Sequence, residues 1–410
     1  MADTAEPSWQ PHYARRADNM KASEIRELLK LLGEPGIISF AGGIPDPVLF
    51  PSEFAATAYG EALSAPNASS HPMQYSVSEG YAPLTGWIAQ HMTELDVPAT
   101  TDNIIITSGS QQALDFLGKL LLTPDDTALV TTPTYLGALQ AFSAYEPRYD
   151  TIDPGKGNRT PQSYAETAAA AAKGAQVKFA YIVPDFANPT GETLTLDGRK
   201  DLLKLAHEID VPILEDTAYR ALRFEGEDLP SLQALDVKDK GSLNASSVIY
   251  LGTFSKTVAP GLRIGWICAS NALIERLVLV KQASDLNSPV LNQMVMHRIV
   301  EDRHIELIET ARQHYRTKRD AMLAALEAHM PAGVRWTKPE GGLFIWLTLP
   351  SGMNSGELLE RSIAEAKVAF VPGAAFYHDG RGANTLRLSY SLPTPAEIKD
   401  GIHRLANLIN

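Results

Sequence analysis

The stretch that decides the fold is "LGTFSKTVAPGLRIGW", residues 251–266. Two hydroxyl residues, Thr253 and Ser255, lead into Lys256, and Arg263 follows seven residues later. Apolar residues flank this cluster on both sides, which is typical of strands buried within a sheet. Because polar and charged groups are costly to bury without partners, the stretch predicts strands that end at a polar site.

Short apolar runs of this kind recur between residues 103 and 269 and alternate with helical stretches such as 111–122 and 196–209. The predicted strands are residues 103–109, 127–133, 177–186, 211–216, 247–253 and 263–269. This alternation predicts an α/β domain with a mostly parallel sheet. Ligands of such sheets bind beyond the carboxyl ends of the strands.

The rest of the chain predicts two further parts. Residues 288–330 have a helical pattern, and shorter strands are predicted at 341–349 and 385–391, as in a smaller α+β unit. Near the start, "SEIRELLKLL" (23–32) has apolar residues at helical spacing but is too short to fold alone. The expected parts are an N-terminal arm (1–50) that docks on the small domain or a partner subunit, a large domain (51–290) and a small C-terminal domain (291–410).

Composition narrows the class of protein. The chain has 410 residues, of which 44% are hydrophobic, and a net charge of −12, which argues against nonspecific nucleic-acid binding. Its single cysteine, Cys268, excludes an internal disulfide and favours a reducing compartment. The first residues lack the apolar core of a signal peptide, and no apolar run has the length of a membrane span. We therefore expect a cytoplasmic protein without nucleic-acid or membrane partners.

Polar side chains follow several of the predicted strands. They are Ser108 to Gln111 before a helix, Asn188 in an "NPTG" turn, Asp216 with Tyr219, and Lys256. A helix N-terminus holds phosphate, a carboxylate holds a protonated ring nitrogen, and a lysine of lowered pKa attacks carbonyls. Each group alone has an ordinary explanation as a cap, a turn or a surface residue. Together they suit an aromatic phosphate ester with an aldehyde and a basic ring nitrogen, which describes pyridoxal 5'-phosphate.

The chain resembles the fold-type I, class I/II pyridoxal-phosphate aminotransferases, in particular the branch of the 2-aminoadipate and kynurenine aminotransferases. Seven motifs in family order carry the resemblance: "SFAGGIPDPVLFP", "QYSVSEGYAPL", "TSGSQQAL", "NPTG", "EDTAY", "SKTVAPGLRIGW" and "LRLSYS". The resemblance implies a large domain with a mostly parallel seven-stranded sheet between helices, a smaller α+β domain, and a homodimer with shared active sites.

The resemblance also implies roles for residues around the cofactor ring. Lys256 is similar to the lysine that binds the cofactor aldehyde covalently and carries the proton during the reaction. Asp216 resembles the partner of the ring nitrogen, and Tyr219 and Asn188 resemble partners of the phenolic oxygen. Tyr135 resembles the aromatic residue that stacks on the ring. Lys256, Asp216 and Tyr219 are thus the expected catalytic residues.

A second set of residues resembles the groups that hold the phosphate and the substrate. The phosphate set is Ser110, Gln111, Ser255 and Arg263, with Thr253 as a further candidate and Tyr75 reaching across from the other subunit. Arg387 resembles the anchor of the substrate α-carboxylate, with Asn188 assisting and Gly42 in the loop that lines the substrate. An arginine within "TLRLSYS" needs an anion, which is either that carboxylate or an internal salt bridge. Arg26 is either a contact of the substrate side chain or a solvated helix residue.

The expected activity is transfer of the amino group of an L-amino acid to a 2-oxo acid by a ping-pong mechanism, without a metal. The candidate donors are 2-aminoadipate and aromatic or branched-chain amino acids, and 2-oxoglutarate is the acceptor by family analogy. Two alternatives stay open: a pyridoxal-phosphate lyase or decarboxylase on the same fold, and a non-catalytic sensor module that binds the cofactor.

Overall fold

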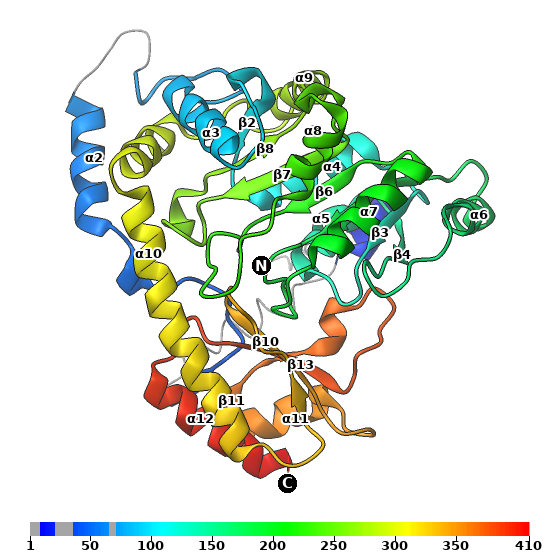
Figure 1. Ribbon diagram of the computed structural model, residues 1–410, viewed down its shortest axis with the longest axis vertical. Helices are drawn as coiled ribbons and strands as arrows, with labels where there is room; N and C mark the ends of the chain where they lie inside the picture. Colours follow the sequence, from blue (N-terminus) through cyan, green and yellow to red (C-terminus); the bar gives the residue numbers. More distant parts are fainter. Residues whose placement is uncertain (1–8, 21–35, 65–70, 410) are drawn as a thin grey trace, which may run out of the picture.

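The computed structural model describes residues 9–20, 36–64 and 71–409, and a seven-stranded sheet lies at its centre (Figure 1). The strands, in spatial order, are β2 (Ile104–Thr107), β8 (Gly265–Cys268), β7 (Val248–Thr253), β6 (Ile213–Asp216), β5 (Val177–Ile182), β3 (Thr127–Val130) and β4 (Arg148–Thr151). All neighbours are parallel except β8, which is antiparallel to both β2 and β7. The α/β fold with a mostly parallel seven-stranded sheet is therefore confirmed.

Helices cover both faces of this sheet. The first face packs against α4 (Ser110–Leu121), α5 (Leu136–Ser143) and α9 (Asn271–Gln282). The second packs against α3 (Ala82–Glu94), α6 (Pro161–Ala171), α7 (Leu196–Ile209), α8 (Leu232–Lys240) and the first part of α10 (Val290–His329). Successive strand residues point to opposite faces, so Ile105 lies in one core and Ile104 and Ile106 in the other. Burial on both faces explains why these strands are continuous apolar runs rather than alternating ones.

Smaller sheets form the lower part of the molecule in Figure 1. An antiparallel sheet has the order β12 (Val371–Pro372), β13 (Thr385–Ser389), β10 (Phe344–Thr348) and β9 (Arg335–Trp336). Beside it, β1 (Ile38–Ser39) pairs in parallel with β11 (Val368–Ala369). The helices that complete this part are α11 (Ser355–Arg361), the π-helical turn η8 (Ser362–Ala366) and α12 (Pro395–Ile409). The predicted strands at 341–349 and 385–391 correspond to β10 and β13.

The 40-residue helix α10 connects the two parts and packs against α3, α12 and α2 (Ser52–Ser64). Figure 1 shows it running from the large sheet down to the smaller ones. The 3₁₀ turns are η1 (Gln10–His12), η2 (Arg15–Asn19), η4 (Pro47–Leu49), η5 (Thr101–Asn103), η6 (Leu243–Ala245), η7 (Pro260–Leu262) and η9 (Gly373–Phe376). The division into domains at residues 50 and 290 stays a prediction.

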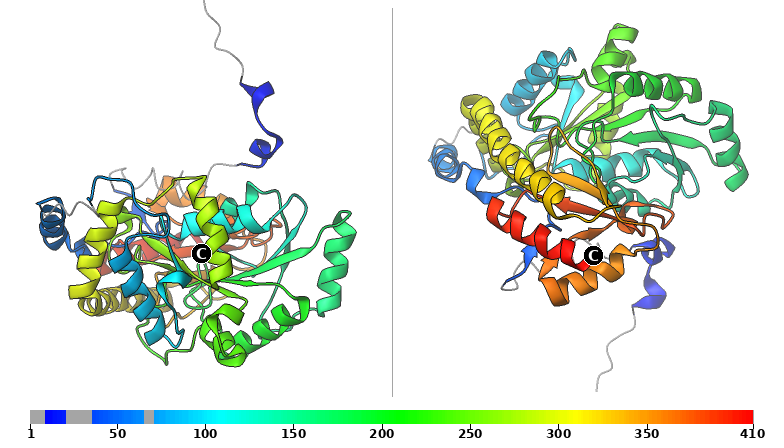
Figure 2. Two further views of the ribbon diagram at one scale, coloured as in Figure 1. Left: turned by 90° about the horizontal axis from the view of Figure 1, so that it is seen from above. Right: turned by 60° about the horizontal axis from the view of Figure 1, so that its bottom comes forward.

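The N-terminal segment with η1 and η2 projects beyond the body of the molecule in the left view of Figure 2. Its Arg15 side chain forms an ion pair with Glu146. The helix predicted at 23–32 and its Arg26 lie outside the described residues. Within the described ranges, no helix has the length and apolar character needed to cross a membrane.

The reversed strand β8 determines what meets at the carboxyl ends of its neighbours β2 and β7. Gly265, its first residue, is paired with Thr107 of β2 on one side and Thr253 of β7 on the other. Because β8 runs against both neighbours, its start lies at their carboxyl ends. A Cβ atom on Gly265 would lie 2.8 Å from the carbonyl carbon of Gly109 and 2.9 Å from the carbonyl oxygen of Gly252. The three strands therefore meet through backbone contacts that only glycine allows.

Replacing Gly265 by alanine tests this contact. The added methyl group meets backbone atoms rather than a flexible side chain, so we expect a destabilisation of about 1–3 kcal/mol, as for other overpacked sites. The measurement is the midpoint of urea unfolding of the cofactor-free protein. Gly261→Ala is the matched control, because a Cβ at Gly261 meets nothing within 4 Å. Equal midpoints for the two variants would contradict this account.

Candidate active site

Lys256 lies in the turn that follows β7. The turn is held by Thr253, whose hydroxyl accepts a hydrogen bond from the amide of Ser255 (3.1 Å) and donates one to the carbonyl of Ile264 (3.2 Å). The Lys256 Nζ atom donates to the carbonyl oxygen of Gly43 (2.9 Å). Burial, with a further contribution from the nearby cation of Arg387, lowers the pKa of Lys256 to about 8. A large fraction of this amine is therefore neutral, and so nucleophilic, slightly above neutral pH.

Asp216 is the last residue of β6, and it is 3% exposed. Its carboxylate accepts hydrogen bonds from the Tyr181 hydroxyl (2.9 Å) and from the amide of Ala218 (3.3 Å). Burial raises the pKa of Asp216 to about 6, and the hydrogen bonds and the charge of Lys256 limit the rise. The group is consequently an anion at neutral pH and can stabilise a cation placed beside it.

Two further tyrosines, Tyr135 and Tyr219, belong to the site, and the charge of Asp216 affects the pKa of both. Tyr219 is buried and packs edge-on against Phe344, with 5.6 Å between ring centroids, and Lys256 Nζ lies 5.7 Å from the Tyr219 ring centre. Burial and the charge of Asp216 raise the pKa of Tyr135 to about 12, and burial raises the pKa of Tyr219 far above its usual value. Both hydroxyls therefore stay protonated and can donate hydrogen bonds to a ligand.

An anion site lies where α4 begins. Gly109 precedes the helix with a positive φ of 78°, and a Cβ atom there would overlap the guanidinium of Arg263. The Arg263 Nη2 atom donates to the carbonyl of Ser108 (2.9 Å), and Nη1 lies 3.5 Å from the Ser255 hydroxyl. Helix N-termini carry free N–H groups and a partial positive charge, so Ser110, the guanidinium and the hydroxyl together suit a phosphate group.

The side chain of Gln111, by contrast, is hydrogen-bonded to other residues of this chain. Its side-chain amide donates to the carbonyl of Gly137 (2.7 Å) and lies 3.5 Å from the Tyr135 hydroxyl. The Thr253 hydroxyl is likewise bonded to the amide of Ser255 and the carbonyl of Ile264. Their places in the phosphate set remain predictions.

Arg387, in β13, is the second cation of the site and is buried, with 2% of its surface exposed. It donates to the Asn188 side-chain oxygen from Nη1 (2.7 Å) and to the carbonyl of Ala41 from Nη2 (2.8 Å). The guanidinium lies 4.3 Å from the ring centre of Phe344 and 5.1 Å from that of Phe376. Burial lowers the pKa of Arg387 to about 10, so the group stays charged at neutral pH.

No carboxylate of the described residues forms an ion pair with Arg387, and its Nε atom has no hydrogen-bond partner there. The alternative of an internal salt bridge therefore finds no support in the described part of the chain. A buried guanidinium without an anion is costly, and a substrate carboxylate would supply the missing charge.

Three other residues were predicted for the site: Gly42, Tyr75 and Arg26. Gly42 is buried in the loop between Ala41 and Gly43, whose carbonyls contact Arg387 and Lys256. Tyr75 is 79% exposed, and its place at the phosphate of another subunit stays a prediction. Arg26 lies outside the described residues.

Several contacts of the site were not predicted from the sequence. Tyr181 bonds to Asp216, and Phe344 and Phe376 cover the guanidinium of Arg387. Tyr181 could have been found from the sequence, because it is a polar aromatic residue near the end of β5, the strand that pairs with the Asp216 strand β6. The two phenylalanines have the pattern of ordinary core residues.

The site residues fit pyridoxal phosphate. The partly neutral amine of Lys256 lies 5.7 Å from the ring centre of Tyr219, three residues after the buried, ionised Asp216, and the charge of each group affects the pKa of the other. The anion site at Gly109 can accept the phosphate, and the pyridinium nitrogen needs a carboxylate of the kind that Asp216 supplies. The unpartnered Nε of Arg387 indicates that a further anionic group belongs beside it.

Comparisons with known proteins agree with this chemistry. Residues 45–405 match the model of the family described as aminotransferase class I and II. The 2-aminoadipate transaminase of Thermus thermophilus is 41% identical over 98% of this chain and 97% of its own length. Aromatic-amino-acid aminotransferase 1 of Thermococcus litoralis is 42% identical over 98% of this chain and 94% of its own.

The fold comparison gives the same result. The crystal structure of α-aminoadipate aminotransferase from Thermus thermophilus, complexed with N-(5'-phosphopyridoxyl)-L-leucine, has a TM-score of 0.87 and 40% identity, with 98% of each chain covered. The family model covers most of this chain, and the relatives share well over 30% of their residues with it. The chain therefore belongs to the class I and II aminotransferases and is a pyridoxal-phosphate-dependent aminotransferase of the 2-aminoadipate and kynurenine aminotransferase branch.

Proposed function

We propose that this aminotransferase binds the α-carboxylate of an L-amino acid on Arg387 and Asn188 and uses Lys256 to move the substrate proton. The observation that supports this most strongly is the convergence of the half-buried amine of Lys256 and the buried guanidinium of Arg387 on neighbouring carbonyls of one loop. Arg387 has no carboxylate partner in the described chain, and it is near enough to lower the pKa of Lys256. A carboxylate held on Arg387 therefore places the adjacent α-carbon toward the Lys256 amine.

The residues around the amine have separate tasks. Bound pyridoxal phosphate supplies an aldehyde that takes up the amino group and an electron-withdrawing ring that stabilises the negative charge at the α-carbon. Asp216, oriented by Tyr181, holds the proton on the ring nitrogen. Tyr219 and Asn188 bind the phenolic oxygen. The N-terminus of α4, with Ser110, Ser255 and Arg263, binds the phosphate.

Lys256 Nζ acts as general base at the substrate α-carbon and would then deliver the proton to the former aldehyde carbon of the cofactor rather than back to the α-carbon. A base works best when its pKa is near the operating pH, and the pKa of about 8 brings Lys256 close to this range. The contact of Nζ with the Gly43 carbonyl gives the amine a hydrogen-bond partner within the site. The donor leaves as a 2-oxo acid before the acceptor binds, which is a ping-pong sequence.

The substrates of relatives support a range of donors. Relatives are named for 2-aminoadipate and for aromatic amino acids, and the solved complex of one contains a leucine derivative. We therefore propose 2-aminoadipate, aromatic and branched-chain amino acids as donors and 2-oxoglutarate as acceptor. The place of Arg26 beside an acidic substrate side chain is part of the same proposal.

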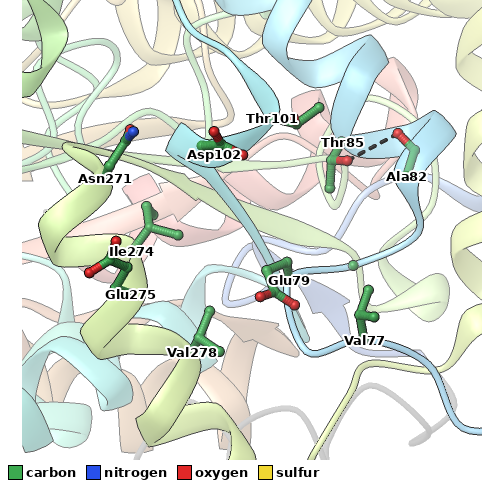
Figure 3. A pocket seen from close by; sticks show the side chains of 11 residues that line it. Val77, Glu79, Ala82, Thr85, Thr101, Asp102, Asn271, Ile274, Glu275 and Val278 are labelled. Atoms are coloured by element: carbon green, nitrogen blue, oxygen red, sulfur yellow. Dashed lines mark hydrogen bonds between the residues drawn. The ribbon is translucent and has the colours of Figure 1, made fainter.

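The active enzyme in this proposal is a homodimer with shared sites, in which Tyr75 reaches the phosphate of the other subunit. Met73, Tyr75 and Val77 expose 78%, 79% and 61% of their surface in one extended segment. Beside this segment lies a hollow of about 610 Å³, lined by residues of the segment itself, such as Val77, and of α3, η5 and α9. Figure 3 shows these side chains. An apolar strip next to a hollow suits coverage by a second copy.

The remaining organisation is proposed on similar grounds. The large domain spans residues 51–290 and the small domain 291–410, with the arm of 1–50 docked on the small domain or the partner subunit. The buried, unpaired Cys268 is in keeping with a reducing compartment, so we propose a cytoplasmic enzyme.

Steady-state kinetics test this function. With 2-aminoadipate, phenylalanine or leucine as donor and 2-oxoglutarate as acceptor, double-reciprocal plots should give parallel lines, and glutamate should form in equal amount to the donor's 2-oxo acid. Lys256→Ala should reduce turnover by several orders of magnitude, whereas Lys204→Ala, at a side chain that is 75% exposed, should not change it. Intersecting lines, release of ammonia or carbon dioxide, or normal turnover of Lys256→Ala would refute the proposal.

The lowered pKa of Lys256 predicts a pH dependence. The neutral amine reacts with aldehydes, and its pKa of about 8 compares with an ordinary value of 10.5. The rate at which cofactor-free protein binds pyridoxal phosphate, divided by the rate for N-acetyl-lysine amide at the same pH, should be constant below about pH 7.5. Between about pH 8 and 10.5 this ratio should fall on the order of a hundredfold as the free lysine loses its proton. Stopped-flow absorbance measures both rates, and a constant ratio would mean that Lys256 has an ordinary pKa.

Arg387 should determine the affinity for the amino-acid carboxylate. Arg387→Lys keeps the charge but loses the planar pair of donors, so kcat/KM should fall on the order of a hundredfold, the loss expected for one or two charge-assisted hydrogen bonds. Arg381→Ala is the control, because Arg381 is exposed and pairs only with Asp379 among the described residues. An unchanged kcat/KM for Arg387→Lys would exclude Arg387 as the carboxylate anchor.

A further inference from the structure

The loop between β1 and α2 contacts both cations of the site. The carbonyl of Ala41 accepts from Arg387 Nη2 (2.8 Å), and that of Gly43 accepts from Lys256 Nζ (2.9 Å). Gly43 also lies against Phe344, since a Cβ atom there would be 2.7 Å from the ring. The position of this loop therefore determines where the carbonyl oxygen atoms of Ala41 and Gly43 lie in the active site.

The first end of the loop is fixed to the smaller sheets. Ser39 of β1 pairs with Ala369 of β11. The next residue, Phe40, donates its amide to the carbonyl of Ala369 (2.7 Å) and accepts the amide of Ser389 (2.8 Å). This end is consequently held by backbone hydrogen bonds like those of a strand.

The other end is fixed by Asp46 to the middle of α10. The Asp46 carboxylate accepts from Lys318 Nζ (2.5 Å) and from His314 Nε2 (2.9 Å), and its backbone amide donates to the Tyr315 hydroxyl (2.9 Å). The second carboxylate oxygen accepts the amide of Val48 at the start of η4 (3.2 Å). One aspartate thus connects the loop to three side chains of the helix.

Lys318 extends this connection to the strand that carries Arg387. Its side chain is 5% exposed, and besides Asp46 it donates to the carbonyls of Ser391 (2.9 Å) and Leu392 (3.1 Å). Those residues lie two and three positions after the end of β13. An ammonium group has three protons, and all three are used here. The same charge therefore joins α10, the loop and the end of the Arg387 strand.

The Asp46 carboxylate stays ionised in this setting. Burial alone would raise the pKa of Asp46, but the hydrogen bonds from Lys318 and His314 outweigh burial and lower it. Charge-assisted hydrogen bonds are short and about twice as strong as neutral ones. Neutralising Asp46 would weaken the connection while changing the shape of the side chain very little.

We propose that Asp46 is a positioning residue for the substrate: through Lys318 and His314 it holds the loop so that the Ala41 carbonyl orients Arg387. Asp46 touches neither substrate nor cofactor in this scheme and acts only through the loop. The inference rests on the proposed function, which makes Arg387 the carboxylate anchor. The groups assigned to the cofactor phosphate, at Ser110, Ser255 and Arg263, have no contact with the loop among their described hydrogen bonds.

The test is Asp46→Asn in the holoenzyme. We expect KM for the amino-acid donor to rise roughly tenfold, as for loss of one charge-assisted interaction, with kcat within about threefold of the parent. The dissociation constant of pyridoxal phosphate, measured by absorbance titration, should stay within about twofold. Asp46→Glu keeps the charge and should recover most of the affinity for the donor.

Asp320→Asn is the matched control. It makes the same chemical change on α10, two residues beyond Lys318, at a side chain that is 53% exposed and pairs with Arg319. This variant should leave KM unchanged. If Asp46→Asn does not fold, Asp46→Asn/Lys318→Met removes the unpaired charge, and the tenfold rise in KM is then expected of the double variant.

The outcomes separate this inference from the proposed function. The first measurement shows whether the parent enzyme transaminates. This result tests the proposed function and does not test the role of Asp46. An unchanged donor KM in folded Asp46→Asn, or in the double variant, would overturn the positioning role and leave the function intact. A parallel loss of cofactor affinity, kcat and donor affinity would also overturn it, since it would indicate general destabilisation.

Discussion

The reversed strand β8 is the constraint on which the active site depends. In a sheet of parallel strands, only residues that follow strands reach the carboxyl edge, but β8 brings to that edge the residues that precede it. Arg263 therefore contacts the residues before α4 and the turn that contains Lys256, although η7 separates it from Lys256 in the sequence. The close backbone contact at Gly265 makes this meeting possible, because any side chain there would separate the three strands.

Burial of charge gives the site its reactivity. Lys256 and Arg387 both lose affinity for protons because they are removed from water, and Asp216 gains affinity for the same reason. The charges of Lys256 and Asp216 partly offset each other's shift in pKa, whereas the cation of Arg387 adds to the fall in the pKa of Lys256. Such an arrangement is unfavourable without a ligand, and the fitting ligand is an anionic, ring-containing cofactor with an amino-acid carboxylate beside it.

Much of this organisation could be predicted from the sequence. Continuous apolar runs located the inner strands, and helix α7 begins and ends where its pattern predicts. Strand β4, "RYDT", was missed because it is a half-exposed edge strand with little apolar character, and two-residue strands such as β1 and β11 carry no periodic signal. The direction of β8 and the contact of Lys318 with Asp46 join residues distant in sequence, and no local pattern reports such pairs.

The predicted Lys256, Asp216, Asn188 and Arg387 do lie around one centre, whereas Tyr75 is exposed and Arg26 is outside the described residues.

The central claim is that one amine, that of Lys256, is the covalent attachment point of the cofactor at the carboxyl edge of the sheet. Reduction of the holoenzyme with borohydride, followed by digestion and mass spectrometry, tests it most directly. The account predicts that the mass of the reduced cofactor appears on the peptide that contains Lys256 and on no other. Its appearance on a different lysine, such as the buried Lys281 or Lys318, or on none, would contradict the account.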